Sequence, residues 1–160
     1  MTLTFEQKSY FELVEGTKNR SGENLDIFQA VFGPVGPDGY PKPVYDKMTG
    51  EIDHSVAEYW KEHYDLRHYL EKNWSWLGQK LVGKIHIYVG DMDTMYLNNA
   101  VRLLEMFLEK TENPYYAGSI EYGDRKPHCW GPESKELMKL FETHIKKNAP
   151  AGEDPSKWIY

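Results

Sequence analysis

The sequence has almost no cysteine and no long hydrophobic run, and both absences exclude classes of protein. Cys129 is the only cysteine among 160 residues, so we expect no internal disulfide and no cysteine-based zinc site. No apolar run approaches the ~20 residues of a membrane-spanning helix, and we expect no membrane partner. A signal peptide is also lacking, which excludes little if the true start of the protein lies upstream of Met1. The sequence therefore leaves the compartment open.

Basic residues are also scarce. The chain has 19 Lys and Arg against 25 Asp and Glu, a formal net charge of −6, and no basic cluster that could neutralise several phosphates. We therefore expect no nucleic-acid partner. Hydrophobic residues make up 40% of the chain and aromatic residues 14%, which is ordinary for a folded protein. A chain of this length buries about 70% of its unfolded surface, and we predict a single domain over residues 1–160.

The spacing of apolar residues predicts a series of helices and two strands. Apolar residues at helical spacing predict helices over 3–15, 54–64, 66–81, 97–111 and 133–147. Alternating β-branched residues predict strands over 84–89 and 118–122, whereas 26–32 fits a helix or a strand. Residues 33–50 hold four of the nine prolines and several glycines, which predicts a long ordered loop, either a lid or a surface connection.

The order strand, helix, strand, helix in the second half predicts a parallel pair with a right-handed crossover, hence an α/β fold. In such sheets ligands lie beyond the carboxyl ends of the strands. Asp91 and Asp93 follow the first strand, and His128 follows the second through a short loop. Because neighbouring strands end about 5 Å apart, a carboxylate and the imidazole can meet there. The acid would fix the ring tautomer and stabilise the imidazolium when the ring takes a proton.

Four segments carry a resemblance to a known family: residues 64–67 (YDLR), 89–101 (VGDMDTMYLNNAV), 121–125 (EYGDR) and 128–130 (HCW). Over roughly residues 20–160 the chain resembles the C-terminal portion of an α/β-hydrolase, more narrowly of bacterial esterase-like hydrolases. The resemblance implies part of the hydrolase sheet, with Asp93 as the acid and His128 as the base of a Ser-His-Asp triad. Asp91 is the alternative acid. We also predict that Trp130 and Tyr96 bind substrate.

The nucleophile that the resemblance implies is missing. None of the serines lies in a Gly-x-Ser-x-Gly turn between a strand and a helix. We therefore interpret the chain as the C-terminal part of a longer serine hydrolase that cleaves a small ester without a cofactor, and expect this chain alone to be inactive. Its partner would be the missing N-terminal half or a second copy of itself. The alternative is a non-catalytic binding domain derived from the same fold.

Other functions for these residues are less well supported. Asp91-x-Asp93-x-Thr94 resembles the nucleophile motif of haloacid-dehalogenase-type phosphatases, but the later acid pair of that family is missing. The same run fails as a calcium loop because its sixth position is Tyr96 and its twelfth is Arg102. The histidines have no partner spacing that predicts a metal site. We expect Cys129 to be a buried packing residue, and Trp74 and Trp76 to lie in the core.

Overall fold

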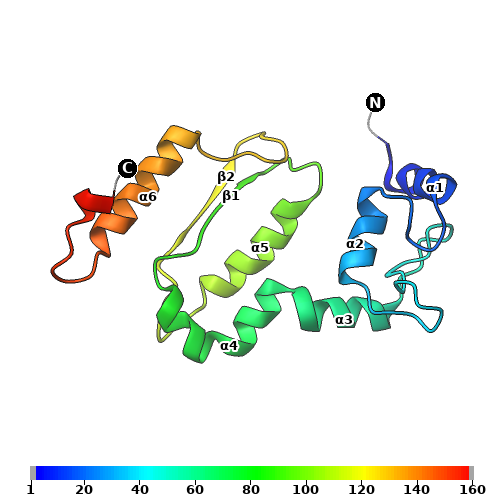
Figure 1. Cartoon of the computed structure of the whole chain (residues 1–160), viewed down its shortest axis with the longest axis horizontal. Coiled ribbons are helices and arrows are strands. Elements are labelled where there is room, and N and C mark those ends of the chain that lie inside the picture. Colours follow the sequence, from blue (N-terminus) through cyan, green and yellow to red (C-terminus); the bar gives the residue numbers. More distant parts are fainter. Residues whose placement is uncertain (1–2, 159–160) are drawn as a thin grey trace. The chain divides into compact units, whose positions relative to one another are not determined.

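Six α-helices, one short 3-10 helix and two strands form the regular structure of residues 3–158, the part of the chain that the computed structural model describes (Figure 1). The contacts divide the chain into two compact units, Met1–Trp74 and Ser75–Tyr160. The first contains α1 (Phe5–Glu15), α2 (Asn24–Phe32) and α3 (His54–Tyr64). The second contains β1 (His86–Gly90), α5 (Leu97–Leu108), β2 (Ser119–Gly123), α6 (Ser134–Lys147) and η1 (Pro155–Trp158). Helix α4 (Leu66–Leu81) runs through the point of division.

The predicted α/β class, with part of a hydrolase sheet and a long loop, is wrong. The described residues are dominated by helices, and their only sheet has two strands. Residues 33–50 do not form one long loop either. They form short turns closed by two isolated antiparallel bridges, Val35 to Pro41 and Tyr45 to Ile52. The prolines and glycines fit these turns, whose backbone bridges the sequence pattern did not reveal.

Unit 1 begins with a helix that its own sequence caps. The Thr4 hydroxyl accepts from the Gln7 backbone N–H, while the Gln7 side chain accepts from the Thr4 N–H. This capping box satisfies two donors at the start of α1. At α3, Asp53 is the N-cap, and its side chain accepts from the N–H groups of Ser55 and Val56. Segment 26–32, which the sequence left open, is helical as part of α2.

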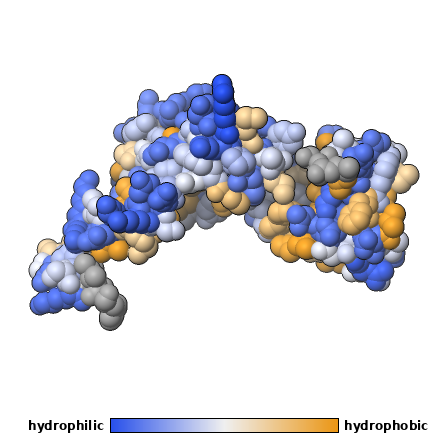
Figure 2. Space-filling view, turned by 90° about the horizontal axis from the view of Figure 1, so that it is seen from above, coloured by the Kyte–Doolittle hydropathy of each residue, from blue (hydrophilic) through white to orange (hydrophobic). Residues whose placement is uncertain are grey.

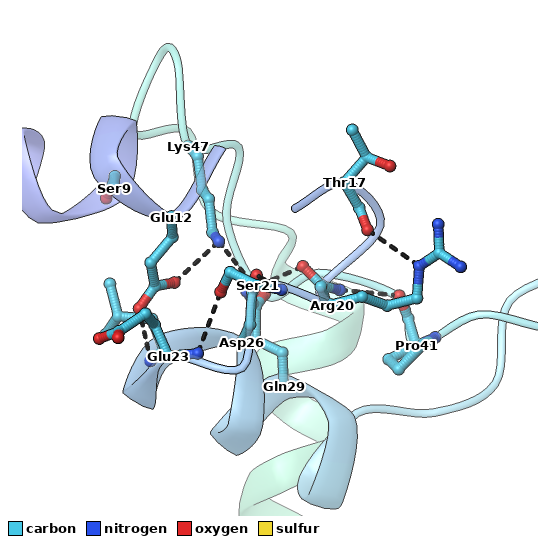
Figure 3. Close-up of polar contacts among 12 residues, drawn as sticks. Ser9, Glu12, Thr17, Arg20, Ser21, Glu23, Asp26, Gln29, Pro41 and Lys47 are labelled. Carbon is cyan, nitrogen blue, oxygen red and sulfur yellow. Dashed lines mark hydrogen bonds and ion pairs between the residues drawn. The ribbon is translucent and has the colours of Figure 1, made fainter. Parts of the chain in front are cut away.

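The interior of unit 1 contains charged groups as well as apolar ones. Glu12 on α1 and Asp26 on α2 are buried, and the Lys47 ammonium lies between them and pairs with both (Figure 3). The Leu25 N–H also donates to Glu12, and the Ser21 N–H donates to Asp26. A lysine from the bridged turns thus connects the first two helices.

Unit 2 is built on the predicted parallel strand pair, which the structure confirms. His86 lies opposite Ser119 and Gly90 opposite Gly123, so both strands end at the same level. In Figure 1 the strands run between α5 and α6. The Tyr122 hydroxyl donates to Glu105 of α5 at 2.7 Å, and the rings of His86 and His144 of α6 lie 5.0 Å apart. The strands therefore present one face to each helix.

Three predictions about burial are wrong. Trp74 is buried as expected, but Trp76 and Cys129 are exposed. Helix α6 has no buried residue, although the helical spacing of Leu137, Leu140, Phe141 and Ile145 predicts a face turned toward a core. Its apolar stripe has the correct helical spacing, but too little of unit 2 packs against it to cover it. Figure 2 shows such apolar residues (orange) at the surface among polar ones (blue).

Candidate functional site

Two glycines bring the histidine loop against the end of β1. A Cβ added at Gly90 would lie 2.2 Å from the Lys126 carbonyl oxygen, and one at Gly123 would lie 2.5 Å from the Trp130 ring. Only residues without a side chain allow this approach. The Met92 N–H donates to the Lys126 carbonyl at 3.1 Å. The segments that follow β1 and β2 are therefore held together by backbone contacts.

Asp93 and His128 meet at this strand end, as the spacing predicted. Asp93 Oδ2 lies 2.9 Å from His128 Nδ1, although 35 residues separate the two in the chain. The aspartate side chain is only 3% exposed and that of the histidine is 36% exposed. A buried carboxylate thus holds an imidazole that reaches solvent. Because the carboxylate can only accept, Nδ1 carries the proton of this bond and the neutral ring keeps its lone pair on Nε2.

The local fold fixes the Asp93 side chain. Its other oxygen, Oδ1, accepts from the Met95 N–H at 2.7 Å, and its own N–H donates to the Gly90 carbonyl. Burial by itself raises the pKa of Asp93, but the hydrogen bonds from His128 and Met95 outweigh it and leave the pKa below its ordinary value. The carboxylate therefore stays ionised at neutral pH.

The second ring nitrogen of His128 is open. Among residues 3–158, no group hydrogen-bonds to Nε2, and no serine, threonine or cysteine side chain hydrogen-bonds to the ring. An imidazole oriented by an acid on one side and open on the other can take a proton from a hydroxyl brought to it. The described part of the chain places no nucleophile there.

The alternative acid, Asp91, does not contact His128. The Asn98 side-chain amide donates to the Asp91 carbonyl at 2.8 Å and so ties the loop to α5. Asp91 Oδ1 and Asn98 Oδ1 are buried and have no hydrogen-bond partner among the described residues. The sequence pattern did not single out Asn98. The only sequence signal for its role is its position: an amide side chain near the start of the helix that follows the loop after β1.

The two residues predicted to bind substrate lie in different surroundings. Tyr96 is 74% exposed and precedes α5 in the left-handed conformation, with φ +59°. This conformation is uncommon for an aromatic residue, and strained backbone often occurs at functional sites. Trp130 packs edge-to-face on Tyr88, with ring centroids 6.4 Å apart, and covers Gly123. Substrate binding by either residue stays a prediction.

The Lys47 cluster of unit 1 is a second candidate, but its chemistry is unsuitable. Burial lowers the pKa of Lys47, yet the hydrogen bonds that its ammonium donates to Asp26 and Glu12 outweigh this effect and raise the pKa above its usual value. Burial likewise raises the pKa of Asp26, and the bonds from Lys47 and Ser21 reverse it and lower the pKa. A lysine that stays charged is neither a base nor a nucleophile. The cluster is structural.

Comparisons with other proteins give no information on the function of this chain, so the site has to be interpreted from its own geometry. No protein-family model, curated protein or solved structure matches this sequence. Within residues 3–158, no three or more His, Cys, Asp or Glu side chains are grouped so that they could hold a metal ion. Over the same range, no helix combines the length and the apolar character needed to cross a membrane.

Proposed function

We propose that unit 2 supplies the acid and the base of a hydrolytic site of the Ser-His-Asp type, with Asp93 as the acid and His128 as the base. The observation that carries this proposal is the 2.9 Å contact between a buried, ionised carboxylate and Nδ1 of a ring that is 36% exposed and whose Nε2 has no hydrogen-bond partner among the described residues. The structural alternative, a surface ion pair, would not require the two close glycine contacts that hold the histidine loop in place.

The serine would come from another segment or another chain. As its hydroxyl oxygen attacks the carbonyl carbon of a small ester, the proton would pass to His128 Nε2. Asp93 would stabilise the imidazolium that forms, and the ring would then give the proton to the departing alcohol. Water would release the acyl group from the serine by the same route. In each step Nε2 takes or gives the proton while Nδ1 stays hydrogen-bonded to Asp93.

The test has two parts. The isolated chain should hydrolyse activated esters no faster than its His128→Ala variant, and a fluorophosphonate probe should label none of its serines. The DNA upstream of Met1 should then be read for an open frame that encodes Gly-x-Ser-x-Gly. In the protein extended by that frame, Asp93→Asn and His128→Ala should each lower kcat about 10³-fold or more.

His63→Ala is the matched control for these variants, because this surface histidine hydrogen-bonds to the Tyr59 carbonyl and stacks on the Tyr59 ring within its own helix. It should leave kcat unchanged. The proposal fails if the extended protein is inactive, or if it is active and the His128 variant equals the His63 variant.

A non-catalytic binding domain is the second candidate, and the surface of α6 favours it. Met138, Phe141 and Ile145 are all more than half exposed along one stripe of this helix. Such surface usually marks an interface. We expect the purified chain to self-associate, and Phe141→Lys to raise the monomer fraction in light scattering. A monodisperse 18.8 kDa monomer would contradict this expectation.

A further inference from the structure

An aromatic cavity in unit 1 lies outside the site described above. It has a volume of about 440 Å³ and is lined by rings from two helices, Phe28 and Phe32 of α2 and Trp60 and Tyr64 of α3. The planes of Trp60 and Tyr64 are inclined by 68° and 65° to that of Phe32, with centroids 6.1 and 5.0 Å away. The rings of Trp60 and Tyr64 therefore stand steeply to that of Phe32 and form an aromatic box with it, while Phe28 stacks on Phe32 at 23°.

The cavity is open, and the polar edge of its tryptophan is turned away. Phe28 and Tyr64 are 55% and 44% exposed. Trp60 Nε1 is buried and has no partner among the described residues, so the electropositive N–H edge does not face the open side where solvent enters. A core aromatic cluster would instead be closed by neighbouring side chains. The faces of aromatic rings carry partial negative charge and attract cations.

The charges at the rim favour a cation as well. Asp65 lines the cavity, and one of its oxygens accepts from the His68 N–H at 3.0 Å. Lys61 also lines it, but its ammonium is paired with Glu58 at 2.9 Å. The charges of Lys61 and Glu58 cancel each other. The carboxylate of Asp65 then gives the rim of the cavity a negative charge. An aliphatic ligand would gain nothing from this charge.

We propose that this cavity binds a quaternary ammonium group, of the kind found in choline or trimethyl-lysine. Three methyl groups fill an aromatic box, and the charge they carry is attracted by the ring faces and by Asp65. A primary ammonium is more strongly hydrated and would lose more on entering. This site is independent of the Asp93–His128 pair and of the hydrolytic activity proposed for it.

The test is an NMR titration of the whole chain with choline chloride, with sodium chloride at equal ionic strength as the reference. Saturable shifts should be confined to amides of residues 28–32 and 57–65. The neutral isostere 3,3-dimethylbutan-1-ol, which has the same shape without the charge, should bind about five- to thirtyfold more weakly. Equal affinity for the two ligands, or no saturable shift with choline, overturns the proposal.

Matched variants separate the cavity from the rest of the surface. Tyr64→Leu should weaken choline binding about fivefold or more, whereas Tyr69→Leu, at an exposed tyrosine that does not line the cavity, should not change it. Asp65→Asn keeps an N-cap for α4 but removes the charge, and should weaken binding about two- to fivefold. Circular-dichroism melts show whether each variant is folded. If folded Tyr64→Leu binds choline as the wild type does, the cavity is not the site.

Discussion

Glu12 and Asp26 in unit 1 and Asp93 in unit 2 are all buried carboxylates with a basic partner, but the partners differ in exposure. The Lys47 side chain is 7% exposed and its ammonium is shared between two carboxylates, whereas the imidazole of His128 reaches solvent and leaves Nε2 open. The first arrangement satisfies its charges within the protein. The second leaves a proton acceptor at the surface. A buried acid alone therefore does not identify a candidate catalytic site. The distinguishing feature is a basic partner that still has an exposed, unpartnered nitrogen.

Removal of Lys47 should give the largest effect. Lys47→Met leaves buried Asp26 without a counter-charge and leaves Glu12 only the more distant Lys8 ammonium, 3.9 Å away. Breaking a buried pair in this way costs about 3–5 kcal/mol. We expect the free energy of unfolding in urea to fall by that amount. Lys18→Met is the control, because the ion pair of Lys18 with Asp38 is exposed, and it should barely change the urea midpoint. If the two variants unfold alike, the Lys47 cluster does not hold unit 1 together.

Gly90→Ala should have the next largest effect and act on unit 2. The new Cβ would lie 2.2 Å from the Lys126 carbonyl oxygen and 2.3 Å from that of Pro127, both backbone atoms that cannot turn away. We expect destabilisation of about 1–3 kcal/mol and loss of the Asp93–His128 hydrogen bond, which NMR of the imidazole nitrogens would report. Gly131→Ala should be tolerated, since its nearest neighbour, Tyr88 Cβ, is 3.8 Å away.

Tyr96→Asn should stabilise unit 2 by about 1 kcal/mol. Tyrosine pays a steric cost in the left-handed conformation that asparagine adopts more readily. The midpoint of thermal unfolding should therefore rise. Tyr115→Asn, at an exposed tyrosine without positive φ, should not raise it. A higher midpoint for Tyr96→Asn would mean that the tyrosine is present for a reason other than stability. An unchanged or lower midpoint would show that the backbone of Tyr96 is not strained.

The smallest effect is on proton binding. In His128→Ala the pKa of Asp93 should rise, because burial remains while the hydrogen bond from the ring is lost. Because the pKa of Asp93 is lower in the folded state than its ordinary value of 3.8, the ionised carboxylate stabilises unit 2 at every pH above 3.8. This stabilisation is lost as the pH falls from 3.8 through the lower pKa of the folded state. The wild type should thus lose more stability in acid than the variant. Carboxyl ¹³C NMR measures the pKa, and an unchanged value in His128→Ala would contradict the prediction.

The strands, most helices and the Asp93–His128 contact followed from local pattern. Alternation of Ile85, Ile87 and Val89 marked the first strand, and parallel strands place their following residues at one edge. The same pattern failed where burial depends on distant segments. Helix α6 has an apolar stripe without a covering partner, and exposed Cys129 was expected to be buried. The α/β class failed because two strands with one crossover do not make a layered sheet.

The sequence by itself determined the periodic elements, because helical and strand spacing act over short distances along the chain. It also predicted the close approach of acid and base, because parallel strands place the residues that follow them at one edge. Only the tertiary structure decided which charges are buried. Glu12, Asp26 and Lys47 are ordinary charged residues in the sequence, each expected at the surface. They are buried together because folding brings three separated segments within hydrogen-bond reach, and a charge leaves water only where its counter-charge is already in place.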